Sequence, residues 1–490
     1  MRKINFGNGA ASNSLLLTFV QVITTVLGII VTKLLSVCFS LQEYGTYSQA
    51  LLITTTATSI SILGLTNATN YFYNRTAENS EKRKYIATIF TIQYIVGVAF
   101  ALAIIAFRFP IALYLKNNEL ATILPIVAFT PFLQNLISMY QVLFVSIGEA
   151  TVIAIRNLLV SLLRLLAVLI ACFLLCNITA VLVVILGLDV IQAVYFFILF
   201  GKHEHPIDVR DTRFVLVKEI LTFSIPMSVY VLTNSMSRDI DKYVISIMAD
   251  TETLAIYTNA AKILPFDMLT SSLITVLIPI ITRMINQKEY GKAKDIFKLY
   301  LRIGYILTFI FVGGAIAVSK NLMLFLYDEK YLIGLPIFII YLLVDMIRFA
   351  NVTTILSGAG KTKILMIISL VTLGLNAIFN VLGYRLLGLI GPALVTLGLT
   401  FGMTIALLHF GAKEMRIKII DLFFLRELIC ILVQIIVVGF LIYSLSIFID
   451  KLKILPIINL ITCYSIYIFI LGILNYRRVL DCFQKLDQYK

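Results

Sequence analysis

The sequence predicts an all-α polytopic membrane protein with about fourteen transmembrane helices, in the manner of two-lobed transporters. Three observations predict this class: 60% of the residues are hydrophobic and only 13% are charged, the mean hydropathy is +0.98, and long apolar stretches follow one another with no gap wide enough for a soluble domain. An apolar segment of about 20 residues crosses a bilayer as a helix, because only an internally hydrogen-bonded backbone persists without water.

The apolar stretches define the predicted spans in order along the chain. The first is too long for the hydrophobic region of a signal peptide and no small-residue cleavage site follows it, so we expect a retained helix. The predicted spans are 13–39, 48–74, 85–107, 120–147, 157–176, 179–200, 217–249, 255–282, 299–319, 334–357, 364–384, 388–410, 428–447 and 455–474.

The formal net charge of +14 is explained by topology rather than by a nucleic-acid partner. With the N-terminus in the cytoplasm, most of the 40 Lys and Arg residues fall in the loops on that side of the membrane. This bias is the positive-inside rule, and it predicts that both termini are cytoplasmic.

The chain carries a weak internal repeat. Lys33 and Lys242 each lie near the outer end of a long predicted helix, and in both places an acidic loop and a tyrosine (Tyr47, Tyr257) follow. An even number of helices separates the copies, so both halves enter the membrane in the same direction. Transporters built from repeats bind substrate near the midplane at the interface of the repeats, which favours transport as the function.

The repeat predicts two six-helix lobes followed by two further helices. The expected boundaries are 1–201 for the N-terminal lobe, 202–216 for a cytoplasmic linker, 217–412 for the C-terminal lobe, and 413–490 for helices 13 and 14 with a cytoplasmic tail.

Ionisable residues inside the predicted spans mark the candidate site, because each costs about 2.5–3.5 kcal/mol on insertion scales. The basic residues outnumber the acidic ones, so the interior is net positive. The basic set is Lys33, Arg164, Arg238, Lys242, Lys262, Arg302 and Arg348, and the acidic set is Asp189, Asp239, Asp241, Asp267 and Asp345.

The densest cluster is on predicted helix 7, where Arg238 and Lys242 are four residues apart and share one helical face. Two interpretations stay open. In the first, Asp239 or Asp241 neutralises these cations near the outer interface. In the second, the two cations and Lys33 face a water-filled cavity and bind an anionic group such as phosphate.

Three further ionisable residues have no obvious local partner and are expected to line the pathway: Arg164 on helix 5, and Lys262 and Asp267 on helix 8. Pro226, upstream of the cluster on helix 7, is expected to bend or locally unwind that helix.

The remaining intramembrane charges are given structural roles. Asp345 and Arg348 are three residues apart and are expected to pair with each other. Arg302 lies close enough to a predicted helix end for its side chain to reach the interface, and we discount it. Asp189 stays ambiguous.

No cofactor, metal or nucleotide is expected, and the chain is not predicted to be an enzyme. The glycine-rich turn from Ser357 to Thr362 resembles the end of a phosphate-binding loop, but no strand precedes it. The histidines His203 and His205 stand alone in a cytoplasmic loop, and no outer loop carries a nucleophile with a base or paired carboxylates.

Several loose patterns follow one another along nearly the whole chain. They are Leu41-Gln-Glu-Tyr-Gly45-Thr-Tyr47, Ser224-Ile-Pro226 with Asp241-Lys242, Ala255-Ile-Tyr257, Tyr327-Asp-Glu-Lys-Tyr331, Ser357-Gly358-Ala-Gly360-Lys361-Thr362, Asn376 with Asn380, and Gly388-Leu-Ile-Gly391-Pro392-Ala393. In order and spacing the chain resembles the polysaccharide (O-antigen-type) flippases of the multidrug/oligosaccharidyl-lipid/polysaccharide exporter superfamily. Ala255 is a mild departure, since the family often has Gly there.

The resemblance implies two lobes around a cationic cavity that move an undecaprenyl-pyrophosphate-linked oligosaccharide across the bacterial cytoplasmic membrane by alternating access, for O-antigen or capsule synthesis. Helices 13 and 14 would form a groove for the lipid tail, and a polymerase with chain-length machinery would be the protein partner. The candidate substrate contacts are Lys33, Arg164, Arg238, Lys242 and Lys262, and the candidate acids for coupling to H⁺ or Na⁺ are Asp239, Asp241 and Asp267.

Three alternatives remain. A cation-coupled multidrug exporter of the same fold would favour an acidic cavity, and this interior is net basic. A flippase for the peptidoglycan lipid precursor is not separated by charge. A membrane-embedded glycan polymerase or ligase would need a large outer loop with catalytic side chains, and the longest predicted outer loop, 320–333, is too short.

Overall fold

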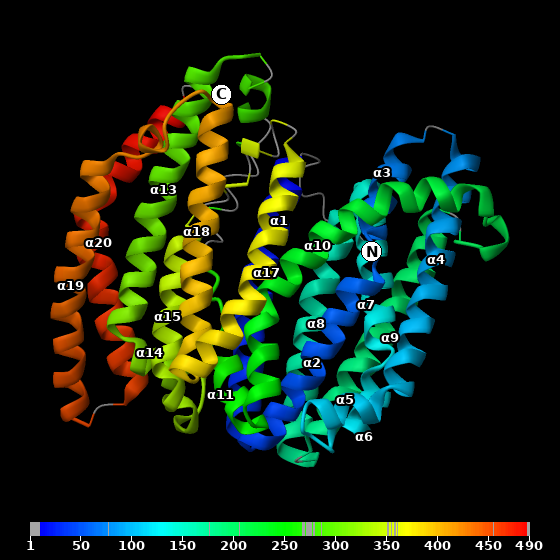
Figure 1. The fold of residues 1–490 in the computed structure, drawn as a ribbon, viewed down its shortest axis with the longest axis horizontal. Helices are drawn as coiled ribbons and strands as arrows, with labels where there is room; N and C mark the ends of the chain where they lie inside the picture. Colours follow the sequence, from blue (N-terminus) through cyan, green and yellow to red (C-terminus); the bar gives the residue numbers. More distant parts are fainter. Residues whose placement is uncertain are drawn as a thin grey trace, which may run out of the picture. The chain divides into compact units, whose positions relative to one another are not determined.

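A computed structural model of the chain confirms the all-α prediction (Figure 1). Among the residues that the structure describes, thirteen helical segments are long and apolar enough to cross a membrane. Most residues of the predicted span 255–282 after Phe266 lie outside the residues that the structure describes, whereas 255–266 lie within them. The described residues are 10–76, 78–175, 177–204, 206–266, 270, 277, 280–285, 287–349, 352–353, 355–356, 359, 361–453 and 455–487.

The chain forms two compact units, Met1–Ala255 and Ile256–Lys490. The last helix of the first unit packs against its second, third and fourth helices. The helices of the first unit are α1 (Ala10–Cys38), α2 (Leu41–Ser61), α3 (Leu65–Arg75), α4 (Asn79–Ala106), α5 (Arg108–Tyr114), α6 (Leu120–Val127), α7 (Thr130–Ser146), α8 (Ala150–Ile170) with a π-helical turn (Ala171–Leu175), α9 (Ile178–His203), a short 3₁₀ turn (Val209–Asp211) and α10 (Phe214–Met248). The sequence-based division into lobes at 202–216 stays a prediction.

Helix α11 (Thr251–Ala260) leads from the first unit into the second. The second unit then contains α13 (Tyr290–Ala317), α14 (Ser319–Leu326), a 3₁₀ helix η3 (Glu329–Gly334), α15 (Leu335–Ile347), α17 (Thr362–Leu387), α18 (Ile390–Glu414), a 3₁₀ turn η4 (Ile419–Leu422), α19 (Leu425–Lys451) and α20 (Pro456–Asp487).

Side-chain capping explains where α2 and α11 begin. Each of these helices starts within one copy of the repeated pattern. Ser40 accepts a hydrogen bond from Glu43 N, and the Glu43 carboxylate accepts one from Ser40 N, which completes a capping box at the start of α2. The Asp250 carboxylate accepts in the same way from Thr253 N at the start of α11. Gly45 lies against the Thr251 backbone, where a side chain would not fit.

Hydroxyl and amide groups join α2 to α10. The Tyr243 phenol donates a hydrogen bond to the Leu52 carbonyl at 2.7 Å. The phenol oxygen of Tyr243 also lies 2.6 Å from Thr56 Oγ1. Further along the two helices, Ser59 and Ser235 exchange a hydrogen bond at 2.8 Å. These contacts place the face of α10 that carries the charged cluster firmly within the first unit.

The two helices nearest the C-terminus form an antiparallel pair beside α13 (Figure 1). At one end, Asp450 of α19 accepts hydrogen bonds from Asn459 of α20 at 2.6 Å and from Asn321 of α14 at 3.3 Å. Between the ends, the Tyr464 phenol donates to the Phe311 carbonyl at 3.1 Å.

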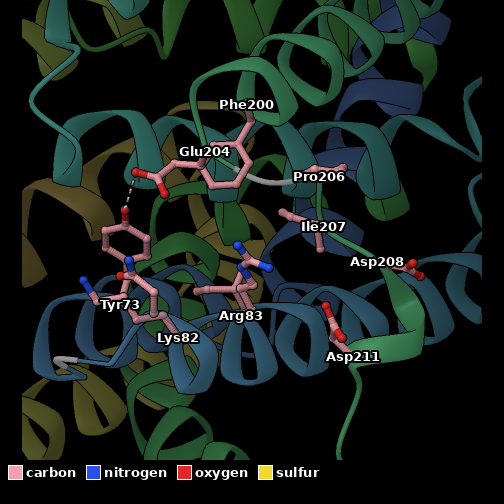
Figure 2. Close-up of a pocket in the computed structure, with 11 residues that line it drawn as sticks. Tyr73, Lys82, Arg83, Phe200, Glu204, Pro206, Ile207, Asp208 and Asp211 are labelled. Carbon is pink, nitrogen blue, oxygen red and sulfur yellow. Dashed lines mark hydrogen bonds between the residues drawn. The ribbon is translucent and has the colours of Figure 1, made fainter.

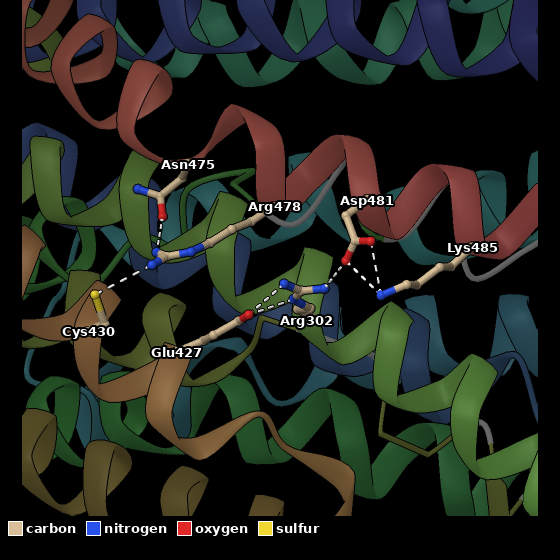
Figure 3. Close-up of polar contacts among 7 residues, drawn as sticks. All are labelled: Arg302, Glu427, Cys430, Asn475, Arg478, Asp481 and Lys485. Carbon is tan, nitrogen blue, oxygen red and sulfur yellow. Dashed lines mark hydrogen bonds and ion pairs between the residues drawn. The ribbon is translucent and has the colours of Figure 1, made fainter.

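At the other end of this helix pair, Arg302 of α13 is buried between two carboxylates (Figure 3). Its guanidinium binds both oxygens of Glu427 at 2.7 Å and one oxygen of Asp481 at 2.7 Å, and it lies over the Phe424 ring. These partners are on α19 and α20, so Arg302 joins three helices of the unit, and its reach to the membrane interface stays a prediction.

Pro226 does not unwind its helix, which was one of its two expected effects. Helix α10 runs without interruption from Phe214 to Met248, with Pro226 inside it. A helix break is found instead after α11, where Ala261–Phe266 are not helical. Pro265 explains it, because proline lacks the N–H that a helix needs and disfavours helical geometry at the residue before it.

Candidate functional site

The charged cluster on α10 carries one ion pair. Lys242 Nζ lies 2.6 Å from Asp239 Oδ1, one helical turn away, and both side chains are mostly buried. Arg238 is exposed, and no carboxylate among the described residues forms an ion pair with it. For Lys242 the structure contains the neutralising contact that the first interpretation expects, whereas Arg238 keeps its charge open to a ligand.

Asp241 differs from its neighbours because it points into the protein. Its side chain is 1% exposed, and its Oδ1 atom accepts a hydrogen bond from Lys242 N at 2.8 Å. A carboxylate held this deeply is not arranged for direct contact with a large substrate, so the ion-coupling role expected for Asp241 fits its position better than a substrate role does.

The other two cations predicted for the first unit lie on neighbouring helices. Lys33 is on α1 and Arg164 is on α8, and these two helices pack against each other over much of their lengths. Lys33 is half-buried, whereas Arg164 is exposed. The two positions are therefore on one helix pair, although they are far apart in the sequence.

A buried polar group that the sequence left ambiguous lies beside them. Asp189 of α9 is 8% exposed and accepts hydrogen bonds from Gln134 at 3.4 Å and Gln192 at 3.2 Å. Arg156 of α8, also buried, lies over the Phe196 ring and donates to Asn157. The sequence prediction missed Arg156 because the predicted span started at residue 157, whereas α8 begins at Ala150.

In the second unit, Lys262 lies in the non-helical stretch after α11. Asp345 of α15 accepts a hydrogen bond from Leu264 N in the same stretch, at 2.9 Å. Both Asp345 and Arg348 are among the described residues and no ion pair joins them, so their expected pairing is not found. Asp267 and His205, like Ser357, Gly358 and Gly360 of the glycine-rich turn, lie outside the described residues.

The linker between α9 and α10 is docked on α4 and covers a pocket (Figure 2). Thr212 and Thr91 exchange a hydrogen bond at 2.7 Å, and Arg213 N donates to Thr88 at 3.0 Å. The pocket has a cavity volume of about 50 Å³, and its charged lining residues are Lys82, Arg83, Glu204, Asp208 and Asp211. Carboxylates outnumber cations there, so the pocket does not favour an anionic ligand.

Within the described part of the chain, no group of three or more His, Cys, Asp or Glu side chains is arranged to hold a metal ion. The candidate residues of the first unit are therefore cations and acids on α1, α8 and α10, and those of the second unit lie in the stretch after α11; the chemistry they offer is charge recognition.

A family model described as "Polysaccharide biosynthesis protein" matches residues 10–285, which is more than half of the chain. The chain belongs to this polysaccharide biosynthesis protein family. A second family model, MatE, matches residues 226–382. No curated protein sequence matches the chain at a significant level.

Solved structures with the same fold include a lipid II flippase and transporters of the multidrug/oligosaccharidyl-lipid/polysaccharide (MOP) exporter superfamily. The lipid II flippase MurJ in an inward closed conformation is 15% identical, with a TM-score of 0.73 over 95% of this chain and 100% of that chain. An inward-facing multidrug resistance MATE transporter is 13% identical, with a TM-score of 0.64 over 84% and 96% of the two chains. A MOP transporter from Pyrococcus furiosus, described as having a binding pocket of reverse polarity, is 16% identical, with a TM-score of 0.59 over 84% and 95%.

At these identities the structural matches establish the fold of this polysaccharide biosynthesis protein and nothing about its ligand. The family match confirms the predicted polysaccharide biosynthesis family, and the long apolar helices confirm a multi-pass membrane protein. The roles of the individual site residues stay predictions.

Proposed function

We propose that this protein flips an undecaprenyl-pyrophosphate-linked oligosaccharide repeat unit across the bacterial cytoplasmic membrane by alternating access, with both termini in the cytoplasm. Its product would feed the synthesis of a cell-surface polysaccharide such as O-antigen or capsule. The family match supports a role in polysaccharide biosynthesis, and the excess of cations among the membrane-embedded charges supports an anionic cargo.

The observation that carries the proposal is the state of the α10 cluster. Arg238 is exposed and has no carboxylate partner among the described residues, and Lys242 is held by a single carboxylate, that of Asp239. A pyrophosphate brings several anionic oxygens, which suit the planar fork of Arg and the point charge of Lys. We assign Arg238 and Lys242 to the pyrophosphate, with Lys33, Arg164 and Lys262 as further contacts.

Energy for the cycle would come from an ion gradient, with Asp239, Asp241 and Asp267 as the candidate coupling acids. Asp239 can act as a coupling acid and also control access to Lys242, because protonation of its carboxylate would release Lys242 to bind the substrate. Polymerase and chain-length proteins acting on the flipped product are the proposed protein partners.

The test is reconstitution. The purified protein in liposomes is expected to move undecaprenyl-pyrophosphate oligosaccharide between leaflets, and Arg238→Ala with Lys242→Ala is expected to lower the rate by at least about tenfold, since each lost charge-assisted hydrogen bond is worth about 1.5–3 kcal/mol. Lys451→Ala with Lys453→Ala removes the same charge from the exposed end of α19 and is the matched control. Equal rates in the two double variants would remove the α10 cations from the site.

The ion pair makes a second, opposite prediction. Asp239→Asn removes the competing carboxylate, so Lys242 is expected to bind undecaprenyl pyrophosphate a few-fold more tightly, because a partly exposed ion pair is worth about 0.2–1 kcal/mol. Titration of the nanodisc-embedded variant with this lipid measures the effect. A weaker affinity than wild type would mean that Asp239 positions Lys242 rather than competing for it.

Two rivals have distinct outcomes in the same liposomes. Export of a small cationic dye without movement of any lipid-linked glycan would favour a multidrug exporter, the activity of the MATE neighbour. Preference for a peptidoglycan lipid precursor over an oligosaccharide repeat unit would favour the activity of the MurJ neighbour.

A further inference from the structure

The break after α11 lies deep in the predicted membrane span. The last α-helical backbone bond runs from Ala261 N to the Tyr257 carbonyl at 2.7 Å, and Lys262, Ile263 and Leu264 are outside the helix. Ala261 is about 15 Å along the axis from Thr251, which is roughly half the thickness of the hydrocarbon core. Non-helical backbone at this depth persists only where protein covers it or where it lines a polar cavity.

A buried carboxylate on another helix takes over one of the backbone donors at the break. Asp345 Oδ2 accepts from Leu264 N at 2.9 Å, a bond that in a continuous helix would go to the Ala260 carbonyl. The Asp345 side chain is 4% exposed. Because a charged group is costly to bury, its place beside a freed backbone N–H indicates a specific function for the pair.

Close packing fixes α15 against the end of α11, so Asp345 is held in place. Gly334, just before α15, faces Ala260 and Ile256, and a Cβ atom there would come within 2.9 Å of Ala260 Cβ. The rings of Tyr257 and Tyr341 also meet edge to face, with centroids 6.5 Å apart. The helix end and the carboxylate therefore belong to one packed body.

We infer that Asp345 is a positioning residue for Lys262. Its carboxylate binds the Leu264 N–H and so holds in place the non-helical stretch that Pro265 imposes, and this fixes the backbone that carries the Lys262 ammonium group toward the phosphates of the substrate. Transporters place discontinuous membrane helices at their substrate and ion sites. The identity of the ligand rests on the proposed function; the break and the contact that holds it do not.

Two variants at one position separate the hydrogen bond from the charge. Asp345→Asn keeps an oxygen that accepts from Leu264 N, whereas Asp345→Leu removes it at similar volume. Hydrogen–deuterium exchange of nanodisc-embedded protein, followed in peptides covering 257–266, is expected to show exchange at Leu264 at least about tenfold faster in Asp345→Leu and near wild type in Asp345→Asn. Unchanged exchange in Asp345→Leu would overturn the inference.

Binding of undecaprenyl pyrophosphate, measured by native mass spectrometry, tests the consequence for Lys262. Asp345→Leu and Lys262→Met are each expected to weaken binding by about tenfold, and the double variant is expected to bind no more weakly than Lys262→Met alone. If the double variant loses affinity by the product of the two single losses, Asp345 acts independently of Lys262, and the inference that it positions Lys262 is overturned. If wild-type protein does not bind this lipid, the proposed function fails, while the exchange result still decides whether Asp345 holds the break.

Discussion

Replacement of Arg302 by Met is expected to lower the free energy of unfolding by about 3–5 kcal/mol, because it leaves two carboxylates without the cation between them. Arg302 is 5% exposed and binds Glu427 and Asp481 at 2.7 Å each, which joins α13 to α19 and α20 (Figure 3). Met preserves most of the side-chain volume, so the loss reports charge and hydrogen bonds rather than a cavity.

The chain has no Trp, so circular dichroism at the helix band in detergent is the suitable measurement. For a unit of this size each kcal/mol shifts the melting temperature by about 2–4 °C. Lys292→Met is the matched control: Lys292 is on the same helix, its pair with Glu289 is solvent-exposed, and such pairs contribute about 0–1 kcal/mol. Combining Arg302→Met with Glu427→Leu and Asp481→Leu is expected to recover most of the stability, because the only charge then left unpaired at this contact is that of Lys485, which is half-exposed to solvent. A shift no larger than that of the control would show that the carboxylates are solvated without Arg302.

Gly391→Val is expected to destabilise the second unit by about 1–3 kcal/mol or more through overpacking. Gly391 is part of the motif from Gly388 to Ala393, and it lies against the backbone of α17. A Cβ atom at this position would overlap the Gly383 carbonyl group and would come within 2.9 Å of Tyr384 N. Backbone atoms cannot rotate away as a side chain does, so α17 and α18 must separate.

Gly398→Val on the same helix is the control, since a Cβ atom there meets nothing within 4 Å. Both substitutions change the intrinsic helix propensity equally, and the difference between their melting temperatures isolates the packing between helices. Equal shifts would mean that α17 and α18 are not in close contact at Gly391.

Local patterns predicted the fold and part of the site. The length and hydropathy of the segments identified nearly every helix, and the spacing of Asp239 and Lys242 on one helix allowed their contact to be anticipated as one of two interpretations. The motif around Gly45 was used only as a family marker, yet the structure gives it a physical reason in the cap at Ser40 and the approach to Thr251.

Partners distant in sequence could not be predicted in this way. Arg302 meets Glu427 and Asp481, which are 125 and 179 residues away, so its depth in the helix alone suggested a side chain that reaches the interface. Asp345 had a cation three residues away, but the contact found for it is a backbone N–H 81 residues away. The two prolines show that local sequence does not decide where a helix breaks. Helix α10 continues through Pro226, whereas the chain is not helical just before Pro265. The carboxylate that binds the backbone there, Asp345, comes from another helix.

The joining of α13 to α19 and α20 has a consequence for biogenesis. Arg302 enters the membrane with α13, long before Glu427 and Asp481 are synthesised, so the nascent chain carries an uncompensated guanidinium until the last two helices arrive. Glu427 gains the guanidinium only when this helix pair docks, whereas Asp481 also has Lys485 on its own helix. The order of synthesis therefore makes the two C-terminal helices the elements that complete the charge balance of α13.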